Sequence, residues 1–152
     1  MSDWGTTTRI RAVVTLASGD VYPGYLHLLD GIHYPAGCEN LLEMLNRPEG
    51  FFPVTLDDGA VFFLARDQVA MVVAEWPPQG VEPPVLPGSP AALQVELANG
   101  EEFMGLIQEP LPKDRARALD FLNASQPFFK LETDTGARFI NGAHVRIIRP
   151  LD

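Results

Sequence analysis

The sequence has a single cysteine, no long apolar run and few basic residues, and each of these shortages excludes a class of protein. With only Cys38 present, no disulfide can form within the 152-residue chain, so a reducing compartment is the default. No apolar stretch approaches the about 20 residues that a membrane-spanning helix needs, and the N-terminus lacks the basic and apolar segments of a secretion signal. We therefore expect a cytoplasmic protein that does not associate with membranes.

The shortage of positive charge disfavours nucleic acid as a ligand. Lys and Arg number 11 against 20 Asp and Glu, which gives a formal net charge of -9. Such a chain repels a phosphate backbone unless basic residues gather into a patch, and the arginines here come only as scattered pairs. The hydrophobic share of 46% and the charged share of 20% are those of a folded globular protein.

Motifs of common catalytic and cofactor sites are also missing. The sequence has neither the Gly-x-Ser-x-Gly of serine hydrolases nor the Gly-x-x-x-x-Gly-Lys of phosphate-binding loops. Four possible metal ligands lie close together in the sequence, but their spacing fits no regular zinc pattern: His27, His33, Cys38 and Glu39. We therefore interpret these four as ordinary loop residues, and we expect no metal, no cofactor and no enzymatic activity.

What the sequence does contain is an internal repeat. Residues 14–20, followed by Gly24, return as residues 95–101, followed by Gly105. Further matches follow in the same order: 42–46 with 119–123, Phe51 and Phe52 with Phe128 and Phe129, 58–60 with 135–137, and Val69 with Val145. A period this long indicates two copies of a small domain. Because a copy of about 70 residues buries only about 60% of its unfolded surface, we expect the two copies to pack on each other.

Prolines mark the boundary between the copies. Six prolines lie within residues 77–90, and proline both fixes φ and removes a backbone donor, so this stretch can be neither a helix nor an inner strand. We interpret it as an extended linker between a first domain at 1–76 and a second at 91–152. The spacing of Pro84 and Pro87 also fits a ligand for aromatic-lined grooves, which is the alternative use of the same segment.

The pattern of each copy predicts five strands and one short helix. Polar turns containing a glycine, at 17–20 and 98–101, separate two β-branched stretches, as in a β-hairpin. Apolar residues at helical spacing follow at 41–45 and 118–122, and three further apolar stretches complete each copy. Five short strands favour closure into a small barrel, because closure removes exposed edges. The expected fold is mainly β, with two tandem five-stranded barrels that each carry one short inserted helix.

The glycines at the expected strand bends support a family resemblance. The first signature of Sm-like barrels is followed in copy one by Leu16, Gly19, Gly24, Leu26 and Asp30, and in copy two by Leu97, Gly100, Gly105 and Ile107. Residues 140–148 resemble the second Sm signature. The resemblance implies a duplicated Sm-like or SH3-like barrel domain, as in bacterial proteins whose activities are largely unassigned. The RNA-contacting residues of the family do not carry over, because their places fall on Tyr34, on Asn141 and Gly142, and on Leu64 and Ala65.

Two acidic tetrads allow a catalytic interpretation and a structural one. Residues 134–137 match the Asp-Thr-Gly core of aspartic proteases, and the equivalent tetrad in copy one is 57–60. Two symmetry-related acids that share a proton are what that chemistry requires. The residues before each tetrad lack the apolar character that seats such an acid in a buried loop, whereas Asp and Gly are standard in hairpin turns. We favour turns, and a protease-like hydrolase acting through Asp134 and Asp58 is the remote alternative.

Four aromatic residues are the candidate partner-binding residues. Phe51 and Phe128 each precede an inward-facing residue, so each either seals the short helix onto its barrel or anchors a partner. Trp4 and Trp76 flank the first copy and allow the same two interpretations. The leading hypothesis is a noncatalytic interaction or scaffold module that binds a protein partner or self-associates. The alternative is nucleic-acid or small-ligand binding by Sm-like barrels.

Overall fold

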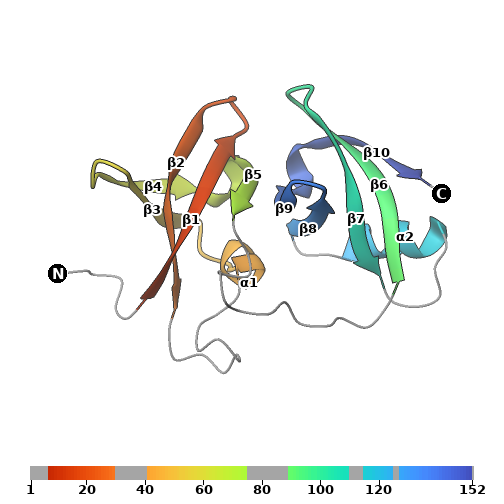
Figure 1. Ribbon diagram of the computed structural model, residues 1–152, viewed down its shortest axis with the longest axis horizontal. Coiled ribbons are helices and arrows are strands. Elements are labelled where there is room, and N and C mark those ends of the chain that lie inside the picture. The colour runs from red at the N-terminus through yellow and green to blue at the C-terminus, as the bar shows by residue number, and fades with distance from the viewer. Residues whose placement is uncertain (1–6, 30–40, 75–88, 110–114, 125–126, 152) are drawn as a thin grey trace.

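The computed structural model describes residues 7–29, 41–74, 89–109, 115–124 and 127–151 (Figure 1). The first repeat contains, in chain order, β1 (Thr7–Leu16), β2 (Val21–Leu29), α1 (Leu41–Leu45), β3 (Phe51–Leu56), β4 (Val61–Ala65), the 3₁₀ turn η1 (Arg66–Gln68) and β5 (Val69–Ala74). The second contains β6 (Ser89–Leu97), β7 (Glu102–Glu109), α2 (Arg115–Ala124), β8 (Phe128–Thr133), β9 (Gly136–Asn141), the 3₁₀ turn η2 (Gly142–His144) and β10 (Val145–Leu151). The mainly β prediction, with one short helix between the second and third strands of each copy, is confirmed. Neither of the described helices is long and apolar enough to cross a membrane.

The strands of both repeats belong to one antiparallel sheet, in the order β10-β6-β7-β8-β9-β5-β1-β2-β3-β4. Each repeat contributes five neighbouring strands, and the repeats lie side by side where β5 pairs with β9 (Figure 1). This differs from the prediction of two separate closed barrels, because the described strands leave β4 and β10 as outer strands. The physical reason is that the edge of β5, which closure within the first repeat would have paired, is paired by β9 of the second.

The first hairpin of each repeat forms as predicted. Gly19 and Gly100 have φ angles of 96° and 95°, in the left-handed region that glycine adopts without strain. Gly19 N donates to Leu16 O and Gly100 N donates to Leu97 O, each at 2.9 Å. The same turn geometry therefore connects the first two strands of both repeats.

Two predicted features lie at or beyond the limits of the described residues. β6 begins at Ser89, so Ser89 and Pro90, the last two residues of the predicted linker, belong to a strand. The rest of that linker, 77–88, lies outside the described residues, as do Trp4 and Trp76.

The two repeats share their apolar interior. One buried cluster consists of residues of the first repeat together with Phe128, Ala137 and Phe139 of the second. The other consists of residues of the second repeat together with Met71 of the first. Because side chains cross the boundary in both directions, the expectation that the two small copies pack on each other is confirmed.

Glycine is required where the second strand of each repeat crosses the third. A Cβ added at Gly24 would lie 2.4 Å from Thr55 O, and a Cβ at Gly105 would lie 2.4 Å from Glu132 O. Both neighbours are backbone atoms, so neither can move aside without displacing β3 or β8. The close approach of these strands thus depends on the absence of a side chain.

We expect Gly24→Ala to lower the free energy of unfolding by about 1–3 kcal/mol, the usual range for overpacking. The midpoint of urea denaturation measures this loss. Gly50→Ala is the matched control, because a Cβ there meets nothing within 4 Å, and its midpoint should stay unchanged. An equal loss in both variants would contradict the role assigned to the close approach.

Candidate functional site

The outer strand β4 carries an exposed apolar surface. Phe51 and Phe63 are 65% and 66% exposed, and Val61 is exposed as well. These three lie on one face, because Phe51 is directly opposite Ala65 in the β3–β4 ladder and side chains alternate along each strand. We call Phe51, Val61 and Phe63 the β4 edge surface. β4 has neither proline nor charge in its sequence, two of the features that commonly keep an edge strand from pairing with another chain.

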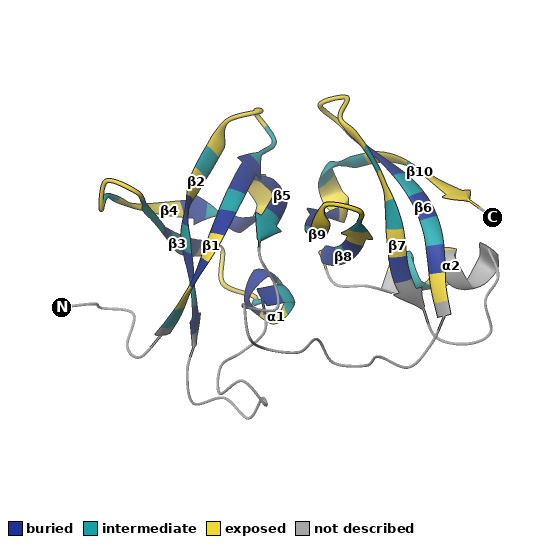
Figure 2. Ribbon diagram, viewed as in Figure 1, coloured by how far each residue is buried: buried dark blue, intermediate teal, exposed yellow. Residues whose placement is uncertain are grey.

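At the junction of β5 with β9, an apolar strand surface is covered by the neighbouring repeat. Phe139 of β9 is only 1% exposed. Figure 2 shows the contrast between the largely buried β9 and the largely exposed β4. His144 of η2 adds a contact across the junction, since its Nε2 lies 2.6 Å from Asp67 O. The ladder itself joins three pairs: Met71 with Ile140, Val72 with Phe139, and Val73 with Arg138.

Asn46, which follows α1, binds the backbone of the other repeat. Its Nδ2 donates to Phe128 O at 3.1 Å, and its Oδ1 accepts from Phe128 N at 2.8 Å. Both backbone groups of a buried residue are thereby satisfied. α1 accordingly contacts β8 and lies at the point where the repeats meet (Figure 1).

The buried Arg66 of η1 fixes the end of α1 that carries Asn46. Its Nε donates to Leu45 O at 2.9 Å and its Nη2 donates to Met44 O at 3.1 Å. These carbonyls belong to the last turn of the helix, where the regular helical hydrogen bonds run out, and Met44 O also accepts from Arg47 N at 3.4 Å. η1 thus positions α1 for its contact with β8.

Replacing Asn46 with alanine should lower the free energy of unfolding by about 1–3 kcal/mol, because Phe128 N and O lose these hydrogen bonds in a buried place. Urea denaturation of a dilute, monomeric sample measures the change. Asn123 occupies the matching, exposed place in α2, so Asn123→Ala should leave the midpoint of the same sample unchanged. An unaltered midpoint in Asn46→Ala would show that this side chain does not hold the repeats together.

The two candidate phenylalanines lie in opposite environments. Phe128 is 1% exposed and belongs to the cluster that contains Met44 of α1, so it packs against the helix of the other repeat. Phe51 is 65% exposed on β3. The predicted seal is with the helix of the same repeat, whereas the structure places Phe128 with α1 of the other repeat and leaves Phe51 exposed. A binding role for either residue stays a prediction.

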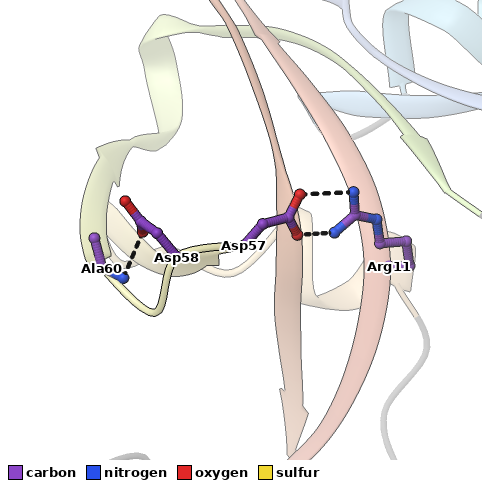
Figure 3. Close-up of polar contacts among 4 residues, drawn as sticks. All are labelled: Arg11, Asp57, Asp58 and Ala60. Carbon is purple, nitrogen blue, oxygen red and sulfur yellow. Dashed lines mark hydrogen bonds and ion pairs between the residues drawn. The ribbon is translucent and has the colours of Figure 1, made fainter.

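The acidic tetrad of the first repeat forms the turn between β3 and β4. The guanidinium of Arg11 donates to both carboxylate oxygens of Asp57, and Asp58 Oδ1 accepts from Ala60 N at 2.9 Å (Figure 3). The hydrogen bond from Arg11 holds the pKa of Asp57 below its ordinary value. Both carboxylates are therefore engaged in holding an exposed turn.

The acidic tetrad of the second repeat also forms a turn, between β8 and β9. Asp134 is exposed there, and Thr133 Oγ1 donates to Gly136 O at 2.7 Å. Gly59 and Gly136 have φ angles of 90° and 118°, as glycines of tight turns do. Figure 1 shows the β3–β4 turn at the outer end of the sheet and the β8–β9 turn near its middle, so Asp58 and Asp134 do not come together.

Of the four possible metal ligands, the structure describes His27, which lies on β2 and not in a loop as predicted. Its Nε2 lies 2.8 Å from Thr55 Oγ1, and burial, followed by the charge of Arg9, lowers the pKa of its imidazole. Within the described ranges, no three His, Cys, Asp or Glu side chains are grouped to hold a metal ion. The other three candidates lie outside those ranges: His33, Cys38 and Glu39.

The pKa of His27 predicts a pH dependence of stability. Because the folded pKa is depressed, the unfolded chain binds a proton that the folded chain does not, and stability should fall as the pH drops below about 6.5. Urea midpoints between about pH 5 and pH 8 test this. His27→Gln removes the titrating group and should flatten the slope in this window. Parallel pH profiles of the two proteins would contradict the assignment.

Asn141, at the place of an RNA-contacting residue in the Sm pattern, is instead a structural residue. It is 2% exposed, its Nδ2 donates to Val69 O at 3.0 Å, and its Oδ1 accepts from Ala143 N at 3.0 Å. The side chain therefore joins the repeats and does not reach the surface. Tyr34, another of these places, lies outside the described residues.

Sequence analysis did not single out Val61 and Phe63, although a signal was present. Residues 61–64 are apolar without alternation, whereas a strand with one face in water is expected to alternate. No family model, curated protein or solved structure matches the chain. The β4 edge surface is thus assigned from its own geometry.

Proposed function

We propose that this chain is a noncatalytic interaction module that binds protein along its β4 edge surface. Each repeat is, in this proposal, a small unit of the Sm-like or SH3-like kind whose five strands remain open within the repeat. Two observations support this assignment of the repeats: the five neighbouring antiparallel strands in each, and the glycine that β2 and β7 require where they approach the next strand. The observation that carries the function is the exposure of Phe51, Val61 and Phe63 on one face of an outer strand.

The composition of this surface favours a specific and stable contact. Burying a phenylalanine side chain fully contributes about 1.5–3 kcal/mol, and the surface offers two of them, Phe51 and Phe63. Aromatic side chains of this kind dominate the binding energy at the centres of interfaces. A strand added beside β4, the last strand in the described order, would bind through backbone hydrogen bonds, which adds directionality to the apolar contact.

Charge near β4 favours a protein over a nucleic acid as the partner. In the turn beside it, the charge of Asp57 is paired with Arg11. The same turn carries Asp58, and η1, which follows β4, carries the exposed Asp67. Together with the net charge of -9, these groups repel a phosphate backbone. An apolar strand edge has no such conflict with a polypeptide.

Site-specific photo-crosslinking tests the proposal. The photoreactive amino acid p-benzoylphenylalanine replaces Phe63 in one variant and Met104 of β7 in the control, because Met104 is 64% exposed but lies in the interior of the strand order. Irradiation of cells that express each variant should give a protein adduct at position 63 and none at position 104. Adducts at neither position, or adducts only to nucleic acid, would refute the proposed function.

A further inference from the structure

We infer that the partner of the β4 edge surface is a second copy of this chain, whose β10 pairs with β4 in an antiparallel, head-to-tail arrangement. This inference rests on the function proposed above and names its partner. Its basis is a correspondence between the repeats. Inside the chain β5 pairs with β9, and the strands that correspond to these two, β10 and β4, are the outer strands of the sheet.

The first correspondence is between β9 and β4. Phe128 is opposite Asn141 in the β8–β9 ladder, as Phe51 is opposite Ala65 in the β3–β4 ladder. Counting along the strands from this pair matches Ile140 with Leu64, Phe139 with Phe63, Arg138 with Phe62 and Ala137 with Val61. The ladder therefore moves the match predicted from sequence by one residue, so Ala65, and not Leu64, takes the place of Asn141.

The second correspondence is between β5 and β10. Val69 is opposite Leu16 in the β1–β5 ladder, and Val145 is opposite Leu97 in the β6–β10 ladder. Both ladders shift register directly after these pairs, so the two strands share the same irregularity. Met71, Val72 and Val73 of β5 thus correspond to Ile147, Ile148 and Arg149 of β10.

Burial separates the corresponding residues according to whether a neighbour covers them. Phe128, Ala137 and Phe139 are buried against the first repeat, whereas their counterparts are the β4 edge surface, Phe51, Val61 and Phe63. On the other side, the first four residues of β5 are buried, but no residue of β10 is. The β4 end is therefore apolar and exposed, while at the β10 end Ile147 is exposed and Ile148 is half-buried against the core of its own repeat. Each end thus offers apolar side chains that a neighbouring strand could cover further.

The inner junction also predicts the register of the outer one. Phe63 of one molecule should lie opposite Ile148 of the next, with Leu64 opposite Ile147 and Phe62 opposite Arg149. An arginine again faces an apolar residue at the end of the ladder, as Arg138 faces Val73 inside the chain. Pro150, which lacks a backbone donor, lies one residue beyond these pairs and so leaves them intact.

The helices repeat the same relation. Asn123 of α2 precedes Phe128 by the five positions that separate Asn46 from Phe51, and Asn123 is exposed where Asn46 binds Phe128. Leu119 of α2 is also exposed, whereas Leu42, its match in α1, packs against the core. In the assembly, Asn123 would bind the backbone of Phe51 in the next molecule.

A contact between two different surfaces of the same chain can be tested by complementation. Phe63→Lys disables the β4 end, Ile147→Glu disables the β10 end, and both residues are exposed, so folding should survive. Analytical ultracentrifugation of the purified wild type should show species that are multiples of 16.7 kDa. Each variant alone should remain monomeric, with a dissociation constant raised at least about tenfold. Their mixture should form a dimer and nothing larger, because one intact end of each kind remains.

The matched control is Met104→Lys, a comparably exposed substitution on an inner strand, which should assemble as the wild type does. Asn123→Ala should weaken the association without affecting a monomeric sample's stability. A wild type that stays monomeric at high concentration would overturn the inference, as would variants that assemble alone. If position 63 still crosslinks to a different protein in cells, the proposed function stands and the self-partner fails. If no protein adduct forms, both fail.

Disulfide crosslinking tests the register in a Cys38→Ser background. Phe63→Cys in one molecule and Ile148→Cys in another should form a disulfide on mild oxidation, because directly opposite residues have Cα atoms about 4.5–5.5 Å apart, within disulfide reach. Phe62→Cys with Ile148→Cys is the control, since adjacent residues of a strand point to opposite faces. Equal yields for both pairs, or disulfides between two copies of the same variant only, would contradict the head-to-tail register.

Discussion

The antiparallel pairing of β5 with β9 is the interaction on which the rest of the structure depends. It pairs the backbone edge of the first repeat and at the same time carries Phe139 into that repeat's interior. Neither repeat has a complete core without the other, because each buried cluster borrows side chains across the boundary. For units of about 70 residues, which bury little surface alone, this sharing is the expected route to stability. Asn46 and Asn141 then satisfy backbone groups that the ladder itself leaves unpaired.

Position in the sheet, more than sequence, decides the environment of each repeated residue. Phe128 and Phe51 stand at the same place in their ladders, yet one is enclosed and the other faces water. The same contrast separates β5 from β10. The two repeats are joined through two different edges, β5 of the first and β9 of the second. Such a head-to-tail joint leaves the other copy of each edge, β10 and β4, at the two ends unless the arrangement closes into a ring. The open β4 and β10 ends of this sheet therefore follow from how its middle is built.

Local features of this fold could be predicted from the sequence, and long-range ones could not. The turns at Gly19 and Gly100 were predictable because a left-handed backbone angle is a local requirement that glycine meets. The partner of β5 was not, because closure within the repeat and pairing with β9 satisfy the same backbone edge and leave the same local pattern. Phe51 and Phe128 show the same limit for the candidate site, since nothing near either residue in the sequence distinguishes a covered place from an open one.

The order of the strands along the chain has a consequence for biosynthesis. β5 ends at Ala74 and its partner begins only at Gly136, so the ribosome adds roughly 60 residues between them, in about 3–12 s. Throughout that interval the β5 edge of a nascent first repeat lacks its partner β9, so β9 of another copy could pair with it instead. Pairing of β5 with β9 of its own chain then competes with pairing to another copy. The covalent link favours the first, because it raises the local concentration of β9. Speed of translation thus becomes a determinant of whether β5 is paired within its own polypeptide or exchanged with another.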